Sequence, residues 1–203
     1  ICGSGIIEAI ACMYLSGIVL PDGVVNGSMA DRSPRIVAKG RTYSYLLSAG
    51  TPEIRILQSD VRAIQLAKAA LYAGTRLLMD RLGVDKVDRI RLAGAFGSHI
   101  DVKYAMVLGM IPDCTLGLVS SANNAAGTGA RIALLSKASR HEIESRVRMV
   151  EKVETAIDEN FQQHFVDALA IPHAKHAFPR LSSAVTLPPV VSENTKRKRR
   201  STD

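Results

Sequence analysis

Apolar residues recur at helical spacing through one long segment in the first half of the chain. Ser59 or Asp60 can begin a helix there, and Gly83 is suited to the position that follows a helix C-terminus. The repeating positions lie three or four residues apart: Val61, Ile64, Lys68, Leu71, Thr75, Leu78 and Leu82. This spacing predicts a helix over about residues 59–82, with these side chains along one face.

Short apolar runs bounded by turn residues predict strands. They lie at residues 43–48, 54–57, 89–93 and 116–120. Other helices are predicted at residues 6–16, 101–108, 124–136, 140–150 and 157–169, and residues 21–39 are expected to form a surface excursion. Because strands and helices alternate through the centre of the chain, the sequence predicts an α/β fold with a mostly parallel sheet flanked by helices.

Composition indicates one folded domain with a charged end. The chain has 203 residues, 47% of them hydrophobic, and a formal net charge of +7. Five of its 26 Lys and Arg residues and one of its 19 acidic residues lie in residues 196–203, so the rest carries 21 basic and 18 acidic side chains. This nearly neutral body does not indicate a nucleic-acid partner. We expect a domain over residues 1–179 and a disordered basic tail over residues 180–203.

The cysteines and the apolar runs indicate in which cellular compartment the protein lies. Cys2, Cys12 and Cys114 form no CxxC pair, which argues against a disulfide framework and against a metal site within the chain. The longest strongly apolar uncharged run, residues 9–21, is too short to span a bilayer. We therefore expect a cytoplasmic protein with no membrane contact.

Glycine-rich segments follow two of the predicted strands. Gly94-Ala95-Phe96-Gly97 comes after residues 89–93, and Asn124-Ala125-Ala126-Gly127 comes after residues 116–120. A strand-to-helix turn of this kind can aim backbone N–H groups at a phosphate, and glycine allows the close approach. The alternative is a turn whose small residues serve packing, and this applies most to the second segment. Neither segment is a Walker motif, because no Gly-Lys-Ser/Thr is present.

Three further side chains have two interpretations each. Lys68 lies in a mostly apolar stripe, so it either extends to solvent or points into a cleft and contacts the ribose or phosphate of a nucleotide. His173 and His176 are three residues apart without a third ligand nearby, so a solvated segment is favoured over a metal site.

Four motifs occur in an order that resembles one family, the reductive activators of corrinoid proteins, and specifically their C-terminal domain. The motifs are Cys2-Gly3-Ser4-Gly5-Ile6-Ile7-Glu8-Ala9, Asp60 to Ala70, Leu92 to Gly97, and Asn124-Ala125-Ala126-Gly127-Thr128-Gly129-Ala130. The resemblance runs from residue 1 to about Pro179. Two positions depart from the family pattern, since Ser98 stands where Asn is expected and Asn123 stands where Gly is usual.

The resemblance implies a fold of the acetate-and-sugar-kinase, heat-shock-chaperone and actin (ASKHA) type. It implies an ATP-dependent activator that returns the cob(II)alamin of a corrinoid protein to cob(I), with an electron from an iron–sulfur domain upstream. The expected cofactors are ATP and Mg²⁺, and the expected partner is the corrinoid protein of a methyltransferase system, with a homodimer left open. The residues expected at the nucleotide are Gly94, Ala95, Phe96, Gly97, Lys68, Asn124 and Gly127.

The chain begins at Ile1 within the first glycine-rich turn, so we expect the catalytic residues and the phosphate-binding hairpins upstream of it. On that expectation, residues 1–203 alone have negligible ATPase activity, because they supply one side of the cleft. Two other functions remain open at this point. One is a kinase of the same superfamily, and the other is a non-catalytic module that docks a partner protein.

Overall fold

The computed structural model describes residues 1–189, and the side chains of Ala95, Phe96 and Ala156 are outside this description. The basic run predicted to be a disordered tail therefore lies largely outside the described residues. Helix α8, Pro179–Ala184, is within them, and its Leu181 is fully buried. The predicted start of disorder near residue 180 is thus wrong for this helix, which a single buried leucine anchors to the core.

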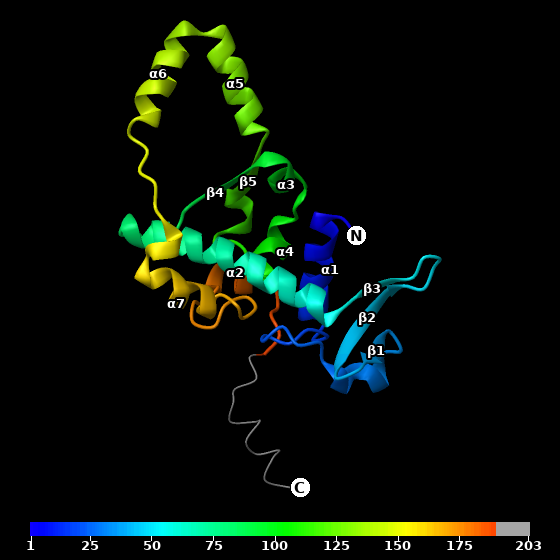
Figure 1. Ribbon diagram of the computed structural model, residues 1–203. Helices are drawn as coiled ribbons and strands as arrows, with labels where there is room; N and C mark the ends of the chain where they lie inside the picture. The colour runs from blue at the N-terminus through cyan, green and yellow to red at the C-terminus, as the bar shows by residue number, and fades with distance from the viewer. Residues whose placement is uncertain (190–203) are drawn as a thin grey trace.

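Helices surround the core (Figure 1). Helix α1, Gly3–Leu15, begins after Cys2, whose sulfur accepts the N–H of Gly5, and so starts three residues before the predicted range of 6–16. It packs on α4, Val102–Val107, which begins at the predicted cap Asp101. The buried side chains of these two helices include Ile7, Ile10, Tyr14, Met106 and Leu108 just beyond α4. Helix α7, Glu159–Asp167, packs on the longest helix.

The longest helix, α2, spans Gln58–Arg81. The Asp60 carboxylate accepts the N–H of Leu57 at the helix N-terminus, and Gly83 has a φ of +65° just after the C-terminus, as the sequence predicts. The face that is buried differs from the predicted stripe. Leu71, Leu78 and Leu82 are exposed. The buried positions are Val61, Gln65, Lys68, Ala69, Tyr72, Ala73, Leu77 and Met79.

Two separate sheets replace the single parallel layer that the order of elements suggested. Strands β1, Ile36–Lys39, β2, Thr42–Ser48, and β3, Ile54–Ile56, form an antiparallel sheet in that order. Short turns join these strands, and a short turn allows antiparallel pairing alone. Strand β1 lies within the segment predicted to be an irregular excursion. The predicted parallel pairing is found between β4, Ile90–Ala93, and β5, Val119–Asn123.

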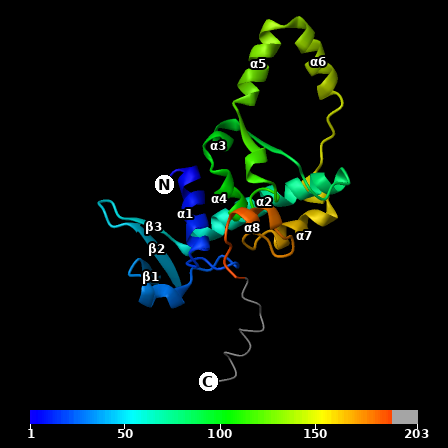
Figure 2. The ribbon, with the colours of Figure 1, turned by 180° about the vertical axis from the view of Figure 1, so that it is seen from behind.

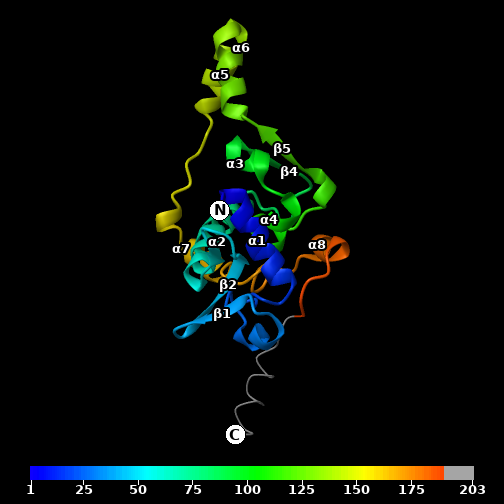
Figure 3. The same ribbon diagram turned by 90° about the vertical axis from the view of Figure 1, so that its right-hand side faces the viewer.

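Helices α5, Ala125–Leu135, and α6, Lys137–Val147, form a hairpin that extends away from the rest of the protein in all three views (Figures 1, 2 and 3). Both helices are described throughout, and neither has a buried residue. Their exposed apolar side chains include Ile132, Leu134, Leu135, Ile143 and Val147. The small residues at the start of α5 therefore do not serve close packing on a sheet, which was the alternative that the sequence left open.

Candidate nucleotide-binding turns

Strands β4 and β5 bring the two glycine-rich segments together. Ile90 pairs with Val119 at the start of the parallel ladder, and Ala93 pairs with Asn123 at its end. Helix α3, Gly94–His99, follows β4 directly, and α5 follows β5 after Asn124. Because the strands are parallel, both strand-to-helix turns lie at the same sheet edge, where α/β folds commonly bind ligands.

Gly94 makes the first turn possible. Its φ is +94°, a backbone conformation that L side chains rarely adopt. A Cβ built on Gly94 would have no described neighbour within 4 Å, so the space beside this residue is open. A turn that is strained for other residues and open on its outer side fits the close approach of a ligand.

Gly97 serves packing. A Cβ at this position would lie 2.9 Å from the Leu92 Cβ and 3.0 Å from the Leu92 carbonyl carbon. Helix α3 thus sits directly on the end of β4, and a side chain there would force the two apart. Ala95 and Phe96 lie between the two glycines in α3.

The second turn is held by asparagine. The Asn124 side-chain oxygen accepts the N–H of Gly127 at 2.9 Å and caps α5. A Cβ on Gly127 would lie 2.5 Å from the Asn124 side-chain nitrogen, so glycine leaves room for this cap. The preceding Asn123 has a φ of +50°, in the left-handed region. Glycine adopts that conformation without strain, and Asn is among the few other residues that adopt it routinely.

Serine hydroxyls connect the two turns. Ser98 Oγ donates to the Gly94 carbonyl at 3.0 Å and lies 3.4 Å from Ser121 Oγ. Ser121 Oγ in turn accepts the N–H of Asn123 at 3.0 Å. Ser98, the second departure from the family pattern, therefore contacts both turns.

Lys68 lies elsewhere. Its side chain is buried, with 1% of its surface exposed, so the interpretation that it extends to solvent is wrong. Its ammonium donates to the carbonyl oxygens of Ala170 and, at 2.8 Å, Pro172. Burial lowers the pKa of Lys68 to about 7. Both acceptors lie in the segment between α7 and α8, so we leave Lys68 out of the site at the two turns.

His173 and His176 are packed and not solvated, contrary to the favoured interpretation. Their rings stack with centroids 4.3 Å apart, and the Tyr72 ring lies 4.8 Å from His173. Tyr72 Oη and His176 Nδ1 form a hydrogen bond of 2.9 Å. Burial, with smaller contributions from His176 and Lys68, lowers the pKa of His173 to about 4. The sequence places Tyr72 one turn after Lys68 on the same predicted helix, which is a signal that this face is packed. It carries no signal that His173 and His176 are the residues that pack there.

Within residues 1–189, no group of three or more His, Cys, Asp or Glu side chains is placed to hold a metal ion. None of the helices in this part of the chain is both long and apolar enough to cross a membrane.

The fold and the paired turns belong to a domain of the ASKHA class. Residues 1–182 match the family model described as the C-terminal domain of RACo, the ASKHA domain. Since the match covers most of the chain, this chain belongs to that family, as the four motifs indicated.

Two relatives extend this finding. The chain is 37% identical over 177 residues to the corrinoid activation enzyme RamQ of Eubacterium limosum, a match that covers 81% of this chain and 30% of the relative. It is also similar to a solved structure of a reductive activator for a corrinoid, iron–sulfur protein, with 30% identity and a TM-score of 0.75 over 86% of this chain and 29% of that one. The chain thus spans about 30% of the length of these relatives.

Proposed function

We propose that the turns after β4 and β5 form one side of a nucleotide-binding cleft. The observation that carries the proposal is that two strand-to-helix turns adjoin at one sheet edge, with Ala93 paired to Asn123. Backbone N–H groups at the two helix N-termini are suited to an anion, and the helix dipoles favour negative charge. The residues assigned to this side are Gly94, Ala95, Phe96, Gly97, Asn124 and Gly127.

The ligand we assign to these turns is ATP with Mg²⁺. The open space beside Gly94 accommodates a phosphate, and the chain's own contribution is to orient it through backbone N–H groups. Mg²⁺ bound together with ATP would supply positive charge that neutralises the phosphates. The catalytic residues, together with the second side of the cleft, are assigned to a part of the protein outside these 203 residues.

The activity proposed for the whole protein is ATP-dependent reduction of a corrinoid protein. One electron passes from a reduced iron–sulfur centre, outside this segment, to cob(II)alamin and gives cob(I)alamin. Support comes from the names of the two relatives, which describe corrinoid activation and reductive activation of a corrinoid, iron–sulfur protein. ATP binding and hydrolysis would shift the conformational equilibrium that makes this transfer feasible.

The test follows the cobalamin absorption spectrum of a corrinoid protein mixed with the full-length activator, an electron donor and Mg²⁺. Cob(I) formation is expected with ATP and not without it. Equal cob(I) formation in both samples rejects the coupling to ATP. Absence of cob(I) formation with any cognate corrinoid protein rejects the activator and favours the kinase or the docking module.

The nucleotide site has its own assay. In calorimetric titrations, the full-length Gly94→Val variant should lose the ATP binding of the natural protein. The Gly117→Ala variant should retain it. Gly117 is a suitable control because it precedes β5 at the other end of the parallel pair and a Cβ there has no described neighbour within 4 Å. Unchanged ATP affinity in Gly94→Val rejects the assignment of the turn.

A further inference from the structure

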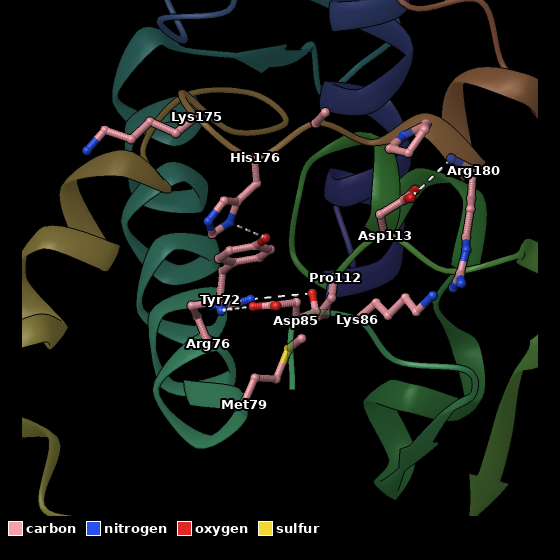
Figure 4. A pocket seen from close by; sticks show the side chains of 12 residues that line it. Tyr72, Arg76, Met79, Asp85, Lys86, Pro112, Asp113, Lys175, His176 and Arg180 are labelled. Atoms are coloured by element: carbon pink, nitrogen blue, oxygen red, sulfur yellow. Dashed lines mark hydrogen bonds and ion pairs between the residues drawn. The ribbon is translucent and has the colours of Figure 1, made fainter. Parts of the chain in front are cut away.

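A cavity of about 400 Å³ lies at the end of β4 opposite the glycine turns (Figure 4). Helix α2 forms one wall, the segment that precedes β4 forms another, and the start of α8 closes the third. Its volume lies within the range that proteins use for small molecules. None of the residues that line this cavity belongs to the proposed nucleotide cleft.

The acidic side chains that line the cavity already have partners within the chain. Asp85 pairs with Arg76 at 3.2 Å, and Arg76 also pairs with Asp80 at 2.6 Å. The Asp113 carboxylate accepts the backbone N–H groups of Arg180 and Leu181 at 3.0 and 2.9 Å. Asp113 thereby fixes the first turn of α8 beside the cavity.

Two cationic side chains remain without a carboxylate partner among residues 1–189. Lys86 is exposed and has no ion pair there. The Arg180 guanidinium donates to the carbonyl of Val87, the residue after Lys86, at 2.8 Å. This contact places the guanidinium at the backbone of the residue that follows Lys86, and Figure 4 draws both charged groups on the side away from Tyr72. Both side chains carry positive charge, which favours an anion as the ligand of this cavity.

Lys175 and His176 also line the cavity, and the Lys175 ammonium pairs with Asp167 at 2.8 Å, while the other lining side chains are mostly apolar. The Tyr72 ring lies on α2 with Met79, and Pro112 and Pro179 face the cavity from two other segments. The hydrogen bond to His176 fixes the Tyr72 hydroxyl. This wall can contact an aromatic or aliphatic body, and Figure 4 draws the two cations on the opposite side from Tyr72.

We propose that this cavity binds a small organic anion, with Lys86 and Arg180 binding a phosphate or carboxylate group and the Tyr72 and Met79 wall contacting its apolar part. Arg offers paired N–H donors to an oxyanion, and Lys adds a point charge. The two anionic groups share this chemistry, so the experiment compares them directly.

The test titrates phenyl phosphate and benzoate, each separately, into the full-length protein, with benzyl alcohol as the neutral probe. Saturable binding is expected for at least one anion, and the tighter of the two identifies the preferred group. Lys86→Gln should weaken that binding about tenfold, the effect of losing one charged hydrogen bond. Lys39→Gln, which removes an exposed lysine at the end of β1, should leave it unchanged.

Three results overturn the inference. One is the absence of saturation by either anion, and another is benzyl alcohol binding as tightly as the anions. The third is Lys86→Gln binding as the natural chain does. Gly94→Val separates this site from the proposed nucleotide site, because anion binding should survive that substitution. Loss of anion binding in Gly94→Val with retention in Lys86→Gln assigns the anion to the glycine turns and rejects the cavity.

Discussion

The Lys68 ammonium donates a hydrogen bond to the carbonyl oxygen of Pro172, which lies 104 residues further along the chain. Gly109 approaches the same carbonyl from another side, and a Cβ built on it would lie 2.0 Å from the Pro172 oxygen. One turn before Lys68, the Gln65 amide donates to the carbonyls of Leu169 and Asp22. Helix α2 thus satisfies the buried carbonyl groups of a segment that has no regular structure of its own.

Lys68→Met should destabilise the folded chain by about 2–4 kcal/mol. The substitution keeps most of the side-chain volume but leaves the carbonyls of Ala170 and Pro172 without their donor, and unsatisfied buried polar groups cost about 1–3 kcal/mol each. Urea unfolding followed by circular dichroism measures the change. Arg62→Met, at an exposed position of the same helix, should change stability by less than about 0.5 kcal/mol. Equal stability of Lys68→Met and the natural chain contradicts the bond's role.

The pH dependence of this effect has a defined sign. Burial lowers the pKa of Lys68 to about 7, below its ordinary value of 10.5. Between these two pH values the unfolded chain binds more protons, so this group makes the free energy of unfolding rise with pH. The stability difference between the natural chain and Lys68→Met should therefore widen from pH 7 to pH 10. A difference that is constant or narrows would mean that the two carbonyls keep the ammonium charged.

Gly94→Ala and Gly97→Ala should differ in how much they lower stability and how much they lower ATP affinity. Gly97→Ala places a Cβ against the backbone of Leu92 and should cost about 1–3 kcal/mol of stability. Gly94→Ala meets open space but must adopt a φ of +94°, which costs about 1–2 kcal/mol, and its added methyl faces the proposed ligand. Comparing unfolding free energy with ATP affinity in the full-length protein separates the two. A larger loss of affinity per loss of stability in Gly97→Ala would reverse the assignment of these roles.

Asn123→Gly should leave the chain as stable or more stable by up to about 1 kcal/mol, because glycine adopts a φ of +50° without strain. Asn123→Ala should destabilise it by about 1 kcal/mol, since alanine lacks both the conformational freedom and a polar side chain for local hydrogen bonds. Thermal unfolding of the two variants provides the measurement. An Asn123→Gly variant that is less stable than the natural chain would show that the Asn123 side chain stabilises the fold by more than its backbone conformation costs.

Local signals predicted much of the fold. Asp101 and Asn124 cap their helices, and Asp60 accepts the N–H of Leu57 from the first turn of α2. The sequence marks these N-termini because a short polar side chain before or at the start of a helical pattern can bond to the free backbone N–H groups there. The same is true of Gly94, whose position after a buried strand indicated a turn. These features depend on neighbours within a few residues, so a single sequence carries them.

Burial in the longest helix depends on distant partners and could not be read in the same way. Leu71 and Leu78 have the apolar character of core residues, yet α7 and the segment after it cover a different face of α2. That segment offers carbonyl groups, which select Gln65 and Lys68 as buried residues against their ordinary preference. Strand β1 was missed because its four residues lie among turn-forming neighbours and pair with β2 across a two-residue turn.

Helix α5 begins two residues after Asn123 and extends with α6 beyond the sheet, so a small rotation at the turn is amplified at the far end of the helix. The helix is about 16 Å long, and a 10° rotation at Asn124 would carry its far end about 3 Å. A rotation too small to alter the hydrogen bonds of the turn would thus be detectable as a displacement of Leu135. We expect ATP to change the distance between spin labels at Leu135 and exposed Leu82 in the full-length protein. Labels at Leu71, within α2, and at Leu82, just after its last residue, should keep their distance. The far end of α5 would then report binding at the turn although it is the part of this helix furthest from the ligand.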